Sequence, residues 1–315
     1  MKFRFNSIKN YFSAILLGLS SLMLSCSDED DNSMTPTNTI VDIVVGSQNF
    51  STLEAAVLKG NVASTLSGEG PFTVFAPDNE SFTNSGITSS ILESLSADQV
   101  KDILLYHTLS ARVNAESIQN GTNAVKTANG KDVYVTKNSN GVYVNGWKVT
   151  QADIAASNGV IHAIERVLMP ASGNLVEVAQ GNQNLSYLVA AVLRASQGTT
   201  NVAQVLGSAG PYTVFAPTNQ AFIDAGFPTI ASIQAADPNT LAGILTYHVL
   251  SARAFSSDLT NGQTLNTVNG GTLAVQLGTS ASIKGNSNST AAQITGMNIM
   301  ATNGVVHLID KVLLP

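Results

Sequence analysis

The chain has 315 residues and a formal net charge of −6 at pH 7, and only 11% of its residues are charged, while 44% are hydrophobic. This length suffices for two domains of ordinary size. No cluster of Lys and Arg occurs, so nucleic acid is excluded as an expected partner.

The first 25 residues have the pattern of a bacterial lipoprotein signal. Basic residues precede an apolar run at 11–25, too short for a comfortable membrane span, and Cys26 follows at once. The letters MLSC resemble a lipobox, in which the cysteine is lipidated, although Met23 stands where leucine is usual. We therefore predict a signal peptide at 1–25 and lipidation at Cys26. The alternative is an unmodified Cys26 near an ordinary cleavage site.

Residues 26–39 predict a polar tether behind the lipidated cysteine. The letters SDEDDNSMTPTNT begin with a short acidic run and are too polar to pack into a core. Acidic residues directly after the cysteine resemble the surface-export signal of some bacterial lipoproteins, and the alternative is a merely solvated tether. We expect an outer-membrane lipoprotein of the cell envelope, exposed at the surface, whose membrane partner is reached through the acyl anchor.

Three phrases occur twice, in the same order, which indicates duplication of a whole domain. The shift grows only from 140 residues (70 to 210) to 145 (158 to 303), so the copies span 40–170 and 174–315. The pairs are GPFTVFAPDNESF (70–82) with GPYTVFAPTNQAF (210–222), ILLYHTLSARV (103–113) with ILTYHVLSARA (244–254), and NGVIHAIERVLMP (158–170) with NGVVHLIDKVLLP (303–315).

Each copy predicts helices first and strands later. Ser51 and Glu54 have capping-box spacing at the start of one helix, and Ser96 caps a second. In the second copy Asp237 is the cap and Pro238 occupies the first helical position. The segments FTVFAP, KDVYVTK, GVYVNGWKV and GVIHAIERVLM alternate as strands do. This order predicts an α+β fold with a sheet core flanked by helices.

The FAPxNxxF phrase has a structural interpretation. A proline ends the strand, and the asparagine, Asn79 or Asn219, caps or turns the chain into the next helix. The following phenylalanine, Phe82 or Phe222, then packs beneath it. We expect this phrase to specify the fold rather than a binding site.

The phrases TVFAPxNxxF and NGVxHxIxxVLxP, with YH between them, resemble the fasciclin domain in order and spacing, twice over. The resemblance implies two tandem fasciclin domains, each a wedge of two packed β-sheets flanked by helices. It also implies an extracellular protein associated with adhesion, without enzymatic activity and without a cofactor.

Four histidines, His107, His162, His248 and His307, lie inside these phrases, and each could be a metal ligand, a catalytic base or a core residue. A zinc site needs three or four converging ligands. Each copy offers two histidines and neither cysteine nor an HExxH pattern, so we predict structural histidines and no metal.

Catalytic patterns are absent from the sequence. No GxSxG elbow and no glycine-rich phosphate loop occur. Paired carboxylates for hydrolysis stay open on spacing alone, but few acids recur, so such a site would exist only in domain one. Four acids of domain one, Asp78, Glu80, Asp102 and Asp153, are replaced by Thr218, Gln220, Gly243 and Asn298.

Two Asp-Ile pairs, Asp102-Ile103 and Asp153-Ile154, resemble adhesion motifs of vertebrate matrix members of the family. Domain two has lost both aspartates, so acid-dependent binding would belong to domain one; the alternative is that the isoleucines are core residues. The single Trp147 is a second candidate, because an exposed aromatic ring stacks on sugars or anchors a partner. Core packing is its structural alternative.

Together these features predict a lipid-anchored adhesion or binding protein that recognises extracellular protein or polysaccharide. The alternative is an accessory glycan-capture lipoprotein of a polysaccharide uptake system, which would need an exposed aromatic platform. The ligand, the oligomeric state and the independence of the two domains do not follow from the sequence.

Overall fold

The computed structural model describes residues 36–315, which form one compact unit. The predicted signal peptide, the lipidation at Cys26 and most of the tether lie outside the described residues. None of the helices in 36–315 has the length and apolar character needed to pass through a bilayer.

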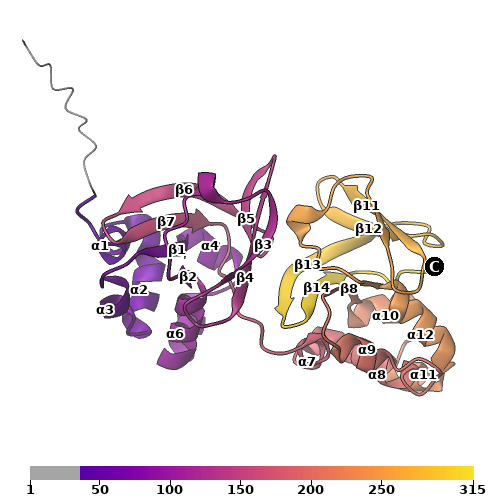
Figure 1. Ribbon diagram of the computed structural model, residues 1–315. Helices are drawn as coiled ribbons and strands as arrows, with labels where there is room; N and C mark the ends of the chain where they lie inside the picture. Colours follow the sequence, from indigo (N-terminus) through magenta and orange to yellow (C-terminus); the bar gives the residue numbers. More distant parts are fainter. Residues whose placement is uncertain (1–35) are drawn as a thin grey trace, which may run out of the picture. The chain divides into compact units, whose positions relative to one another are not determined.

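Domain one begins with three helices and ends on a strand (Figure 1). Its helices are α1 (Ile40–Val45), α2 (Ser51–Lys59), α3 (Ala63–Leu66), α4 (Asn79–Asn84), α5 (Ser89–Ser94) and α6 (Ala97–Tyr106), with 3₁₀ turns η1 (Gln48–Phe50) and η2 (Ala115–Ser117). Its strands are β1 (Phe72–Pro77), β2 (Thr108–Leu109), β3 (Gly121–Lys126), β4 (Asp132–Asn138), β5 (Gly141–Val144), β6 (Trp147–Ala156) and β7 (Gly159–Ile164).

Domain two repeats the same order of elements. Its helices are α7 (Leu175–Gln180), α8 (Ser186–Ala195), α9 (Val202–Gly207), α10 (Asn219–Asp224), α11 (Ile230–Ala235) and α12 (Pro238–Tyr247), with η3 (Gln183–Leu185) and η4 (Ser256–Asp258). Its strands are β8 (Tyr212–Pro217), β9 (Val249–Leu250), β10 (Thr264–Asn266), β11 (Thr272–Leu277), β12 (Ala281–Gly285), β13 (Ala292–Ala301) and β14 (Gly304–Ile309).

The seven strands of each domain form one continuous order. In domain one it runs β2-β1-β7-β6-β5-β4-β3, and in domain two β10-β11-β12-β13-β14-β8-β9. The α+β prediction with two tandem domains is confirmed. The two expected sheets share one long strand, β6 or β13, whose register shifts where it meets β7 or β14. A bulged strand bends, so one strand serves both halves of the wedge.

The closing strand of each domain is an inner strand of the sheet, flanked on both sides. β7 pairs in parallel with β1, from Phe72 opposite Gly159 to Pro77 opposite Ile164, and antiparallel with β6. All six residues of β7 are buried. Val74 faces a cluster made with the helices, whereas Phe75 faces a second cluster made with β4, β5 and β6. The NGVxHxI phrase is therefore the inner strand between two cores.

Two predicted helix starts are confirmed. Ser96 caps α6 in a capping box with Gln99, and Asp237 caps α12 with Pro238 at its first turn. These signals are local: the capping oxygen and the N–H that it accepts from lie three residues apart.

The predicted cap at Ser51 is wrong. The residue before α2 is Phe50, which has no side-chain cap, and Ser51 is already helical. The free N–H of Thr52 donates instead to Oδ1 of Asn79, at 3.0 Å. A residue 27 positions away thus caps the helix. A pattern of neighbouring residues cannot predict such a cap.

The same contact revises the predicted role of the asparagine in FAPxNxxF. Asp78 and Thr218, not the asparagines, cap the helices α4 and α10 that follow. Asn219 accepts from Tyr187 N–H of α8 at 3.0 Å, as Asn79 does at α2. The asparagines therefore connect the FAP strand to an earlier helix. The phenylalanines of the phrase, Phe82 and Phe222, are buried as expected.

The predicted strand GVYVNGWKV is two strands joined by a turn. Asn145 has φ 50° and Gly146 has φ 79°, the left-handed conformations that a two-residue hairpin turn requires. Similarly, β7 stops at Ile164, so the final ERVLM of that segment lies outside the strand. Alternation alone does not reveal where paired strands reverse.

Candidate functional site

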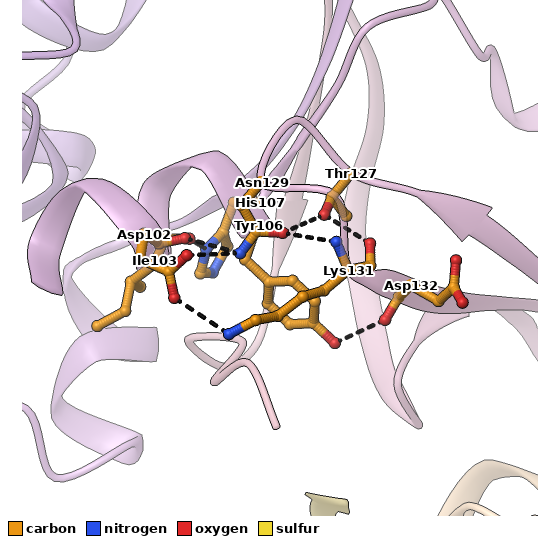
Figure 2. A network of polar contacts seen from close by, with 8 residues as sticks. All are labelled: Asp102, Ile103, Tyr106, His107, Thr127, Asn129, Lys131 and Asp132. Atoms are coloured by element: carbon orange, nitrogen blue, oxygen red, sulfur yellow. Dashed lines mark hydrogen bonds and ion pairs between the residues drawn. The ribbon is translucent and has the colours of Figure 1, made fainter. Parts of the chain in front are cut away.

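The Tyr-His pair at the end of α6 is locked into the fold (Figure 2). His107 Nδ1 lies 2.8 Å from the Ile103 carbonyl, and His107 Nε2 accepts from Leu168 N–H at 2.9 Å. Because Nε2 accepts, the ring carries its proton on Nδ1. Tyr106 donates to the Asp132 carbonyl at 2.9 Å, and burial raises the pKa of Tyr106 to about 12.

Domain two repeats the arrangement at His248. Its Nδ1 lies 2.8 Å from the Ile244 carbonyl, and its Nε2 accepts from Leu313 N–H at 2.8 Å. Burial lowers the pKa of His107 and of His248 to about 4. Both rings are therefore neutral at pH 7 and hold the chain after the closing strand against the end of a helix.

The histidines of the closing strands use the opposite tautomer. His162 Nδ1 accepts from Asp153 N–H at 3.1 Å and its Nε2 lies 2.8 Å from the Val113 carbonyl. His307 is placed alike, with Nε2 at 2.9 Å from the Ala254 carbonyl, and burial lowers its pKa to about 4. In all four histidines both ring nitrogens are occupied by backbone groups.

This geometry leaves the histidines no free lone pair for a metal or for a substrate proton. Within residues 36–315, no group of three or more His, Cys, Asp and Glu side chains could hold a metal ion. The arrangement can join strand, helix and loop, which is the work of a structural residue.

Asp102, the aspartate of the first Asp-Ile pair, lies over the turn between β3 and β4 (Figure 2). Its carboxylate accepts from Asn129 Nδ2 at 3.0 Å and from Lys131 Nζ at 3.3 Å. In domain two Gly243 stands at the place of Asp102, and Asn269 donates only to the Gly243 carbonyl. The turn is kept in both domains, and only domain one adds the half-exposed ion pair.

Asp153 of the second pair has a backbone role. It adopts φ 59° within the bulge of β6, and its Oδ1 accepts from Ala115 N–H at 2.9 Å. Asn298 adopts φ 61° at the same place in β13, and its Oδ1 accepts from Ser256 N–H at 2.8 Å. Asp and Asn tolerate this left-handed conformation better than most residues. Both domains therefore keep the acceptor, and only the charge differs.

The structure does not bring the two Asp-Ile pairs together. Asp102 contacts the β3–β4 turn, whereas Asp153 contacts the start of η2. Ile103 and Ile154 are half-buried and pack against the helical core of domain one. The carboxylate of Asp78 is likewise used locally, as the cap of α4. These acids have separate partners and form no shared acid–base pair.

The sequence of this chain matches the model of the Fasciclin domain at residues 48–170 and again at 184–315. These segments cover more than half of the chain. The chain belongs to the fasciclin family. Fasciclin domains occur in adhesion and extracellular matrix proteins.

Relatives of this fasciclin protein include periostin of Homo sapiens, 30% identical over 88% of this chain and 31% of periostin. Transforming growth factor-beta-induced protein ig-h3 of Sus scrofa is 29% identical over 79% of this chain and 35% of its own length. Protein sll1483 of Synechocystis is 40% identical over 42% of this chain and 73% of its own length. The chain spans about a third of the two animal relatives.

A solved fasciclin domain pair, from the insect cell adhesion molecule fasciclin I, aligns with 85% of this chain and 97% of its own chain. That alignment has 19% identity and a TM-score of 0.41.

Side chains of the two fasciclin domains contact each other at one place that the sequence did not reveal. The guanidinium carbon of Arg253 lies 4.3 Å from the ring centroid of Tyr134. The Tyr134 ring also lies against that of Phe255, with centroids 5.7 Å apart. Asn138 donates to the Ser257 carbonyl at 3.3 Å. Segment 253–257 of domain two thus contacts strand β4 of domain one.

A difference between the fasciclin copies could have indicated this junction. The buried Phe255 stands where domain one has Asn114, and Tyr134 stands where domain two has Ala274. An apolar residue gained at a loop position in one copy is the expected signature of a surface that has become covered. Only the comparison of the copies, not either copy alone, carries this signal.

Trp147 is half-buried in fasciclin domain one and packs against its second core cluster. The guanidinium carbon of Arg166 lies 5.1 Å from the Trp147 ring centroid. Because core residues contact part of the indole and the Arg166 guanidinium lies over its ring, the indole does not offer a sugar an open, flat surface.

Proposed function

We propose that this protein is a cell-envelope adhesion protein, anchored by lipid at Cys26, which binds extracellular partners through surfaces of its two fasciclin domains. The observation that carries the proposal is the match of both domains to a family found in adhesion and matrix proteins. The buried, backbone-bonded histidines support a binding role without a catalytic centre. They are used to fix the fold rather than to face a substrate.

A protein partner is favoured over polysaccharide by the state of Trp147. A glycan-capture protein needs an open aromatic face, and this ring is half-buried beneath Arg166. Asp102 and Asp153 are both accessible to a receptor, since the first is half-exposed and the second exposed. We include both as candidate contact residues of the adhesive surface.

The test of adhesion uses bacteria that display the full chain. Cells expressing the protein should be retained on surfaces coated with collagen or fibronectin, more strongly than cells without it. Coatings of alginate and chitin form the polysaccharide arm. Retention on the polysaccharides alone would favour the glycan-capture alternative, and retention on none of the four would contradict the proposed function.

The anchor is tested separately. Cys26→Ala should move the protein from the membrane fraction to the soluble fraction, because it removes the acylated thiol. Membrane association that is unchanged by Cys26→Ala would contradict lipidation at this residue, whatever the adhesion assay shows.

A further inference from the structure

A cleft of about 650 Å³ lies beside the junction of the two domains. Domain one contributes the start of β6 and the chain that follows β7, and domain two contributes β13. Its lining includes Trp147, Arg166, Met169, Thr295 and Met297. Its volume is that of a site for a drug-sized ligand or a few side chains.

Arg166 supplies an unpaired positive charge to this cleft. Within residues 36–315 the ion pairs are Lys126–Asp132 and Lys131–Asp102, so no described carboxylate pairs with Arg166. The adjacent Glu165 accepts from Lys148 N–H at 2.8 Å. No fully buried side-chain nitrogen of the described residues lacks a hydrogen-bond partner, so the free guanidinium N–H groups are open to the cleft.

The rest of the lining is mainly apolar and adaptable. Met169 is 52% exposed, and Met297 and Trp147 are half-buried. Methionine, tryptophan and arginine are the residues enriched where proteins bind proteins. Thioether side chains also repack around different apolar groups. A sugar would require several free polar partners. Of the polar side chains in the lining, Ser85, Asn145, Thr295 and Asn298 already form hydrogen bonds within the protein, which leaves Arg166 and Ser172.

Domain two lacks the same pair of residues. Ala292 begins β13 where Trp147 begins β6, and Lys311 takes the place of Arg166. Ala292 is buried, and Lys311 Nζ is tied to the Ala291 carbonyl at 3.2 Å. The cation over an aromatic ring is thus a feature of domain one alone, at the position where the cleft lies.

We propose that this cleft binds a short segment of a protein partner in which an acidic residue neighbours an apolar one. The carboxylate would pair with Arg166, a bidentate geometry that guanidinium favours. The apolar side chain would lie against Met169, Met297 and the Trp147 indole. This inference rests on the proposed binding function and names a site and a partner class for it.

The test uses the fluorescence of Trp147, the single tryptophan of the chain. The full chain in detergent is titrated with an acetylated, amidated hexapeptide of alternating leucine and aspartate. We expect a saturable change in emission, and binding weakened at least tenfold when asparagine replaces aspartate in the peptide. A charge-assisted hydrogen bond has about this effect. No saturable change, or equal binding of both peptides, would overturn the proposal.

Variants then locate the charge. Arg166→Gln should weaken binding of the aspartate peptide by about tenfold or more, while Lys311→Gln, the same position in domain two, should leave it unchanged. Equal effects of the two variants would also overturn the proposal. Both variants are compared by thermal unfolding, so that an unfolded Arg166→Gln is recognised; the asparagine peptide then tests the charge on the wild-type chain.

The outcome is distinguishable from a failure of the proposed function. If the wild-type chain does not bind the aspartate peptide and cells displaying Arg166→Gln still adhere, the cleft is not the site but adhesion stands. If the wild-type chain adheres to no coating, the proposed function fails irrespective of the peptide result.

Discussion

The two domains keep the same buried histidine contacts, and at one surface site they differ by a pair of residues. At the turn beside the Tyr-His motif, Asp102 and Lys131 form an ion pair in domain one, and Gly243 and Gly271 occupy those places in domain two. Both members of the pair have changed together. The turn beneath them is held by the same asparagine contact in each domain. The charged residues on the surface therefore differ between the domains, while the hydrogen bond that holds the turn is the same.

The bulge residues of the two domains differ in exposure. Asp153 is exposed, whereas Asn298 is 5% exposed, because domain one covers it. A Cβ on Gly146 of domain one would stand 2.6 Å from the Asn298 amide nitrogen. A buried carboxylate without a counter-ion is costly. The neutral asparagine at 298 is thus explained by the junction, and its absence of charge need not reflect a lost receptor contact.

The shared histidines predict acid unfolding of both domains. An unfolded imidazole takes up a proton near pH 6.5, while His107, His248 and His307 resist protonation down to about pH 4. Stability present above pH 6.5 should therefore be lost as the pH falls towards 4, by about 3 kcal/mol for each of these three. Urea unfolding measured at intervals from pH 7.5 to 4 checks this; a flat profile would contradict it.

Removing one of these rings tests whether the copies use them equally. His107→Ala and His248→Ala should each cost about 3 to 5 kcal/mol, because each removes two hydrogen bonds of the ring, leaves the N–H of Leu168 or Leu313 unpaired, and creates a void. Thermal unfolding of the full chain measures the loss. Wild-type stability in either variant, accompanied by weaker adhesion, would instead indicate a histidine that acts in binding.

Exchanging the bulge residues should break the symmetry of the domains. Asn298→Asp should destabilise by about 1 to 3 kcal/mol, since it buries a charge and removes the donor that Ser256 accepts at 2.7 Å. Asp153→Asn, the matched control, keeps the acceptor at an exposed site and should change stability by less than about 0.5 kcal/mol. Denaturation followed by circular dichroism compares them, and equal costs would show that burial at the junction does not require a neutral residue at 298.

The smallest effect is expected at the surface ion pair. Asp102→Gly combined with Lys131→Gly reproduces domain two in domain one, and loss of the pair itself should cost about 0.5 kcal/mol, less at high salt. A double-mutant cycle isolates this value from the cost of the glycines. A coupling energy that exceeds about 2 kcal/mol, or that does not change with salt concentration, would mean that the ion pair contributes to the stability of the fold.

The sequence was sufficient for the duplication, the α+β class and the caps at Ser96 and Asp237, because these depend on repeats and on neighbours three residues apart. It could not place the contact of Asn79 with α2, which crosses 27 residues. Nor did it reveal that Asp153 and Asn298 adopt positive φ. This conformation is set by a bulge in a paired strand, and a bulge produces no periodic pattern of residues from which it could be predicted.

The candidate surfaces were predicted less well than the fold. Trp147 stands out as the single tryptophan, whereas Arg166, whose guanidinium lies over its ring, is hidden inside a repeated phrase. The junction residues Tyr134 and Arg253 belong to different copies, so that neither repeat implies their contact. Contacts between domains depend on how two folded surfaces fit together. The residues of each surface lie in different parts of the sequence, so no pattern within one repeat predicts the contact.

The parallel pairing of β1 with β7 has a consequence for the order of folding during synthesis. The two strands are separated by 87 residues (72 to 159), and the later one lies between β1 and β6. A nascent domain therefore lacks this inner strand until its last residues leave the ribosome, and until then β1 and β6 have an open edge. Such distant pairing is slow to form, so each domain has an interval during synthesis when a chaperone or an export machinery can hold it unfolded.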